Sequence, residues 1–231
     1  MNPARRCGRG FTLIELLVVI ALIATMSAFL VGGLRGNKTA RLQTAQATIA
    51  NLITAARTRA AASGCRVRLL INADAANSAR FRRMIAMQQE TSYKADDWTT
   101  TVTVVTLPEG IIVLPYKDRI PTGLYANSGD WTKTAAGSGS SQLQSSSLWA
   151  TPVTIAVQMT AAEDWDVIQF TPNNTMTYGT GDLVLATASV RPPGSYMPGE
   201  SPARAESPDT VRGITISTYG VPSLINSRSG F

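Results

Sequence analysis

The sequence predicts an α+β fold in which a long N-terminal α-helix packs on an antiparallel, β-rich head. Three observations support this prediction. An apolar run occupies residues 16–34, apolar residues then recur every three or four positions to about residue 60, and beyond residue 65 short alternating segments are separated by turn residues. We therefore divide the chain into a basic leader of residues 1–10, an apolar helix of residues 11–34, an amphipathic continuation of residues 35–64 and a head of residues 65–231.

The apolar run has the length of a membrane-spanning helix. Residues from Leu16 to Leu34 include no charged side chain, and a spanning helix needs about 20 predominantly apolar residues. Basic residues stand on both sides of the run, so their count does not decide its orientation. The residues that we assign to the membrane helix are Leu16, Leu17, Val18, Val19, Ile20, Leu22 and Ile23.

The order of segments differs from that of a secretory signal peptide. A signal peptide is cut after its apolar core, so the core is lost. Here the small residue Gly10 lies before the apolar run, between that run and the arginines of the leader. A single carboxylate, Glu15, stands at the entrance to the run, where a charge costs roughly 2.5–3.5 kcal/mol on insertion scales. Such a residue indicates a function.

Residues 10–20 read GFTLIELLVVI, and this segment resembles the cleavage and N-methylation motif of prepilins, the precursors of type IV pilins and related proteins. The resemblance implies that a membrane-embedded prepilin peptidase and N-methyltransferase cuts after Gly10. Phe11 then becomes the N-terminal, methylated residue. Glu15 becomes the residue needed for filament assembly.

Elementary electrostatics supports the same roles. Cutting after Gly10 leaves a new α-amino cation at Phe11 in or near lipid, where an anion close by stabilises it. Glu15 of a neighbouring subunit is the obvious anion, and the pair would set the axial register of a filament. The alternative is a plain membrane anchor in which Glu15 reaches the interface.

The amphipathic segment predicts a helix that packs on the head and stops at Ser63–Gly64. One helix would then run from about residue 12 to about residue 62. Its predicted core face consists of Leu42, Ala45, Ile49, Leu52, Ile53, Ala56 and Ala60.

The head is predicted to contain short strands joined by turns. Two Ser-, Gly- and Pro-rich stretches, Gly137–Ser147 and Arg191–Pro208, are expected to be surface loops. The expected strands are Arg66–Ile71, Arg80–Gln88, Thr101–Leu107, Gly110–Leu114, Val153–Met159, Val167–Phe170, Met176–Tyr178, Leu183–Ala188, Val211–Tyr219 and Val221–Ile225.

Scattered segments of residues 65–225 are similar to the heads of H-type minor pseudopilins of type II secretion and of the related minor pilins. These segments include RVRLLI, ARFRRMIAMQQ and VRGITISTYGVPSLI. An insert around Tyr125–Ser147 and the Pro-rich loop before Val211 depart from that pattern, so no docking surface of that family can be placed on this chain.

The composition argues against catalysis. The sequence has no histidine, which removes the commonest general base and the commonest metal ligand. One cysteine of two, Cys7, lies in the leader, so processing leaves Cys65 without a disulfide partner in the chain. We expect no cofactor and no metal site. The rival hypothesis is a membrane-anchored enzyme that uses a carboxylate pair among Asp164, Asp166 and Asp182.

An arginine-rich segment raises a nucleic-acid hypothesis. Five arginines on two predicted neighbouring strands could form a basic stripe for DNA phosphates: Arg66, Arg68, Arg80, Arg82 and Arg83. The formal charge of +6, partly due to the leader, is too small to require a nucleic-acid partner. The alternative is a charged outer sheet face above a core-facing Phe81 and Met84.

Together these observations predict a minor pseudopilin that joins a type II secretion-type pseudopilus through its N-terminal helix. Its expected partners are the peptidase, other pilins or pseudopilins and the inner membrane. The head would lie in the periplasm of a bacterium. The alternative within the same architecture is a minor pilin of a type IV pilus that binds DNA during uptake.

Overall fold

The computed structural model describes residues 13–23, 37–98, 100–133, 142–146, 150–157 and 161–231. The chain divides into two units, Met1–Lys38 and Thr39–Phe231. Residues 13–23 are helical, while residues 24–36 lie outside the described part of the chain. The prediction of one continuous helix from residue 12 to residue 62 is therefore tested only at its two ends.

Helix α2 (Asn37–Ser63) agrees with the predicted amphipathic segment. All seven residues of its predicted core face are buried. The helix ends where the sequence predicted, because Gly64 has φ +66°, a left-handed conformation that glycine adopts without steric strain.

The first sheet has the strand order β3-β2-β1-β6-β5, and every neighbouring pair is antiparallel. The hydrogen-bonded neighbours β1 and β6 lie far apart in the sequence. The strands are β1 (Val67–Asn72), β2 (Met84–Gln89), β3 (Thr100–Thr106), β5 (Ala150–Ile155) and β6 (Glu163–Phe170).

The second sheet has the order β10-β9-β7-β4, again antiparallel, and β8 pairs with the far end of β7. These strands are β4 (Ile111–Val113), β7 (Gly181–Val190), β8 (Ala203–Ala205), β9 (Val211–Ile216) and β10 (Pro222–Ile225). The described residues of the head also form three short 3-10 helices: η1 (Lys117–Arg119), η2 (Ser128–Asp130) and η3 (Arg228–Gly230).

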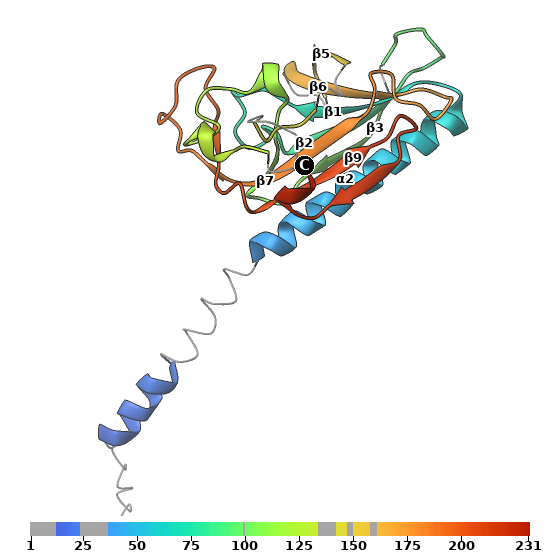
Figure 1. The fold of residues 1–231 in the computed structure, drawn as a ribbon. Helices are drawn as coiled ribbons and strands as arrows, with labels where there is room; N and C mark the ends of the chain where they lie inside the picture. The colour runs from blue at the N-terminus through green and yellow to red at the C-terminus, as the bar shows by residue number, and fades with distance from the viewer. Residues whose placement is uncertain (1–12, 24–36, 99, 134–141, 147–149, 158–160) are drawn as a thin grey trace, which may run out of the picture. The chain divides into compact units, whose positions relative to one another are not determined.

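One core joins α2 to both sheets, and Figure 1 shows the helix running beside β9. Ile49 of α2, Ile168 of the first sheet and Leu185 of the second sheet belong to the same buried cluster. A second cluster covers the other face of the second sheet and includes Trp131 and the C-terminal Phe231. The expected β-rich head with a packed helix is confirmed.

Some predicted boundaries were wrong. Residues 80–83 form a turn rather than the start of β2, since Arg82 has φ +57° and its N–H donates to the carbonyl of Asn72 at 2.9 Å. Within the expected loop Arg191–Pro208 the structure contains β8, whose Ala203 and Ala205 are buried. Small residues with no apolar alternation gave no signal for this strand.

Other strand ends also differ, since β6 begins at Glu163 rather than at Val167 and β9 ends at Ile216 rather than at Tyr219. The expected strand Met176–Tyr178 is reduced to a single bridge between Met176 and Phe170. Strand β5 begins and ends earlier than Val153–Met159, and residues 158–160 lie outside the described part.

A buried glutamine attaches α2 to the second sheet. Gln46 is 1% exposed, and its amide nitrogen donates to the carbonyl of Gly213 at 2.7 Å and to that of Ile225 at 2.8 Å. Its amide oxygen accepts from Arg212 at 3.1 Å. The side-chain amide of this buried polar residue therefore has hydrogen-bond partners at both its nitrogen and its oxygen, and it satisfies carbonyls on β9 and β10.

We predict that Gln46→Ala lowers the free energy of unfolding by about 2–4 kcal/mol, because it leaves buried carbonyls without donors. Urea unfolding of the full chain in detergent measures this change. Gln43→Ala, an exposed position on the same helix, is the control and should change stability by less than about 0.5 kcal/mol. Equal stabilities of the two variants would contradict the assigned role.

Candidate functional site

The predicted cleavage and methylation residues, Gly10 and Phe11, lie outside the described residues. Glu15 lies in the described helix of residues 13–23, near its start, and its side chain is exposed. The carboxylate thus stands on the outer surface of this helix, where another molecule can reach it.

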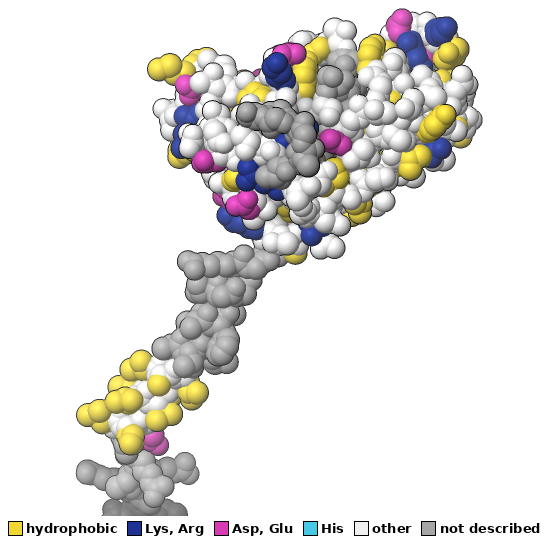
Figure 2. All heavy atoms as spheres, in the orientation of Figure 1, with side chains coloured by type: hydrophobic (Ala, Val, Ile, Leu, Met, Phe, Trp, Pro, Cys, Tyr) yellow, Lys and Arg dark blue, Asp and Glu magenta, His cyan; other side chains and the backbone are white. Residues whose placement is uncertain are grey.

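The helix of residues 13–23 exposes large apolar side chains at nine of its eleven positions, and Figure 2 shows such side chains in yellow on the face in view. They are Leu13, Ile14, Leu16, Leu17, Val18, Val19, Ile20, Leu22 and Ile23, with exposed fractions between 46% and 82%. A helix that is apolar on every side is stable only in lipid or among other helices, since burying each side chain is worth about 1.5–3 kcal/mol. This helix with Glu15 is the candidate assembly site.

No helix within the described residues is both long enough and apolar enough to cross a membrane. Of the predicted membrane run Leu16–Leu34, residues 24–34 lie outside the described part. The spanning helix therefore stays a prediction from the sequence.

The central arginine of the proposed DNA stripe is buried inside the head. Arg82 is 1% exposed, and its guanidinium forms an ion pair with the carboxylate of Asp166 on β6. The Nε of Arg119 lies 3.2 Å from the other oxygen of Asp166. Burial lowers the pKa of Arg82, and the charge and hydrogen bond of Asp166 oppose that effect. Arg82 therefore has an internal structural role.

Arg66 and Arg68 contact residues of β2 and of the loop between β2 and β3. Arg66 forms ion pairs with the buried Glu90 and with Asp96, the latter at 2.5 Å. The hydrogen bond from Arg66 holds the pKa of Glu90 at about 2 despite burial. Arg68 donates to Gln88 at 2.8 Å, and its guanidinium carbon lies 4.3 Å from the centre of the Trp98 ring.

Arg80 and Arg83 also have partners within the protein. Arg80 forms an ion pair of 3.0 Å with Glu163, and Arg83 donates to the carbonyl of Leu107 at 3.1 Å. The five arginines thus do not form one exposed stripe. Phe81 and Met84 are buried, as the alternative to DNA binding required. This geometry disfavours DNA binding.

The sequence did not reveal which carboxylates serve these arginines. Glu90, Glu163 and Asp166 are buried, and two of the three lie more than eighty residues from their partners. Only strand pairing between β1 and β6 brings them together. The one signal in the sequence that could have indicated these buried carboxylates is an acidic residue standing alone in or beside an apolar strand.

The three carboxylates of the enzyme hypothesis have separate partners. Asp166 pairs with the buried arginine, Asp164 accepts from the Thr154 hydroxyl at 2.6 Å, and Asp182 accepts from the Thr215 hydroxyl at 2.8 Å.

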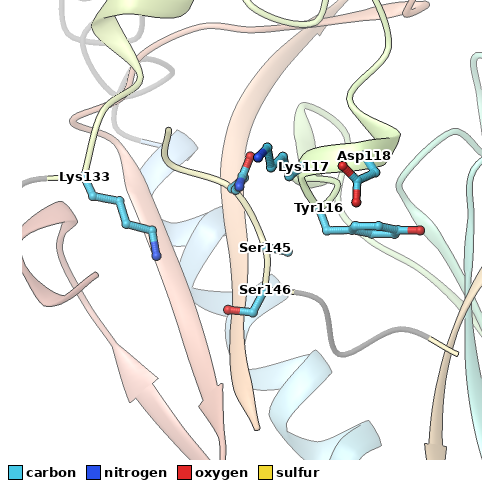
Figure 3. A pocket seen from close by; sticks show the side chains of 7 residues that line it. Tyr116, Lys117, Asp118, Lys133, Ser145 and Ser146 are labelled. Carbon is cyan, nitrogen blue, oxygen red and sulfur yellow. The ribbon is translucent and has the colours of Figure 1, made fainter. Parts of the chain in front are cut away.

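The enzyme hypothesis requires a pocket lined by two carboxylates. A pocket of about 270 Å³ in the head does not have such a pair. Figure 3 shows Tyr116 and Asp118 on one side of this pocket and Lys133 on the other. Its lining residues are Tyr116, Lys117, Asp118, Lys133, Gln144, Ser145 and Ser146, so Asp118 is the one carboxylate among them.

Comparison with known families identifies the N-terminus. Residues 5–31 match the family described as the prokaryotic N-terminal methylation motif. The chain carries a prepilin-type N-terminus. This motif supports a type IV pilin-like subunit in general, processed by prepilin peptidase and assembled with other pilins. No curated protein and no solved structure matches the chain, so the resemblance of the head to H-type pseudopilins stays a prediction.

We predict that Asp166→Asn lowers the free energy of unfolding of this pilin-like chain by about 3–5 kcal/mol, because it leaves the buried Arg82 charge without a counter-ion. Asp164→Asn is the matched control, since this carboxylate is exposed on the same strand and should contribute less than about 1 kcal/mol. Urea unfolding in detergent compares the two. A similar small effect for both would show that the Asp166 pair is not needed for folding.

Proposed function

We propose that the chain is a minor pseudopilin that enters a type II secretion-type pseudopilus through its N-terminal helix. The observation that carries the proposal is the segment GFTLIELLVVI at residues 10–20, whose described part is a helix with exposed apolar side chains and an exposed Glu15. Before assembly the same helix would hold the subunit in the bacterial inner membrane, with the head in the periplasm.

The head supports a structural role in this proposal. Several of its described arginines form ion pairs with carboxylates of the same head, as with Arg82 and Asp166 or Arg66 and Glu90. A head stabilised by internal ion pairs resembles a packing unit more than a nucleic-acid surface. We therefore favour the secretion-type filament over the DNA-uptake pilus, and we propose that the head has no catalytic activity.

The first test is the intact mass of the protein from membranes of cells with and without a prepilin peptidase. We expect peptidase-dependent loss of residues 1–10 and the gain of one methyl group on Phe11, while Gly10→Ala blocks the cut. An unprocessed chain, or a cut beyond Leu34, would refute the proposal and indicate an ordinary anchored or secreted protein.

The second test concerns Glu15. We predict that Glu15→Gln is cleaved normally but enters filaments at least about tenfold less, because it removes the anion that pairs with the new N-terminal cation in a low-dielectric setting. Immunoblots of sheared filaments and of membranes measure both steps. Glu109→Gln, an exposed carboxylate of the head, is the control. Normal assembly of the Glu15 variant would show that the carboxylate sets no register.

A further inference from the structure

Strand β3 forms one edge of the first sheet. Among the described residues it pairs only with β2. Its sequence, TTVTVVT, contains no charged residue and no proline, and five of its side chains are partly exposed. Natural sheets normally protect an edge of this length with charges or proline, because unpaired backbone groups attract other strands.

The other edges of the two sheets carry such protection. Strand β5 contains Pro152 and an irregular register, β10 begins with Pro222 and has four residues, and β4 has three residues. β3 also has a register shift, opposite Met87 and Gln88, but this shift does not block the edge. It places two consecutive residues, Val102 and Thr103, on the same side of the strand, where both line a groove between β3 and α2. β3 is therefore the edge best suited to accept a further strand.

A groove of about 630 Å³ lies between β3 and α2. Met87, Val102 and Thr103 line it on the sheet side, and residues of α2, most of them small, line it on the helix side. The lining residues of α2 are Asn51, Thr54, Ala55, Thr58, Arg59 and Ala62.

A groove between a helix and a sheet edge has the geometry of β-strand addition. The incoming backbone bonds to the edge, while alternate side chains, about 6.6–6.8 Å apart, enter the groove. The apolar lining selects apolar or β-branched side chains at those positions. α2 contains no acidic residue, and its exposed Arg59, whose Nε donates to the side-chain oxygen of Gln89 at 2.6 Å, lines the groove. A carboxylate beside the incoming strand therefore complements the charge of the site.

We propose that β3 and this groove bind an extended segment of a neighbouring filament subunit by β-strand addition. The proposal rests on the proposed function, because a filament supplies the neighbour. The bound segment carries apolar or β-branched residues at alternate positions and a carboxylate next to Arg59.

The common direction of subunits in a filament favours binding of a different segment of the neighbour over pairing of β3 with β3 of a second copy. Two β3 edges related by a two-fold axis would pair antiparallel and would run their α2 helices in opposite directions. Subunits that leave one membrane into one filament keep a common direction. The contact is therefore heterologous, with β3 of one subunit meeting a different surface of the next.

The test places a photo-crosslinking amino acid, p-benzoylphenylalanine, at Thr103 in the full chain in cells that assemble filaments. Ser223, exposed on the β10 edge, is the matched control position. We expect Thr103, and not Ser223, to crosslink to another pilin-like subunit. Mass spectrometry should map the crosslink to alternate residues of one extended segment. A crosslink to β3 of a second copy, to a helical segment or to nothing would overturn the proposal.

A lysine substitution provides the second arm. Val102→Lys, which places a charge in the groove, should reduce filament incorporation about tenfold and abolish the Thr103 crosslink. Ser223→Lys, the control, should assemble normally. Thermal unfolding verifies that both heads are folded, and a folded Val102→Lys variant that assembles normally would refute the proposal. Peptidase-dependent cleavage, measured in the same cells, reports on the proposed function separately.

Discussion

The buried ion pair between Arg82 and Asp166 lies where the two sheets of the head meet. The backbone of Arg82 donates to Asn72 at the end of β1 and accepts from Val113 at the end of β4, so one residue links both sheets. A left-handed conformation at a non-glycine residue is unfavourable and persists only where its surroundings enforce it. The pair with Asp166 and the two backbone hydrogen bonds supply that constraint.

This junction explains how the β-rich head holds α2. With the sheets joined near Arg82, their apolar faces and α2 enclose one core, to which Ile49, Ile168 and Leu185 contribute from three elements. Gln46 then fixes the helix to β9 and β10 by hydrogen bonds that no apolar residue could make. The result is that α2 is attached to the sheets of the head both by apolar packing and by hydrogen bonds.

The head and the described N-terminal helix differ in where their charged side chains lie. In the head, basic and acidic side chains such as Arg66 and Glu90 neutralise each other within the fold. In the described N-terminal helix, Glu15 is the one charged residue and stands exposed among apolar side chains. The exposed carboxylate of Glu15 thus differs from the buried carboxylates of Glu90 and Asp166, which form ion pairs inside the head.

The sequence by itself determined the features that depend on local periodicity and on short contiguous motifs. The core face of α2, its end at Gly64, the β-rich class of the head and the prepilin-type N-terminus were all predictable, because each is encoded within a few turns or strands. Only the tertiary structure decided whether the arginines are exposed or paired inside the head. Arg82 and Asp166, for example, are 84 residues apart and meet through the pairing of β1 with β6. The same holds for β8, which pairs with β7, and for the groove beside β3, which lies between α2 and β3, two elements that are distant in the sequence.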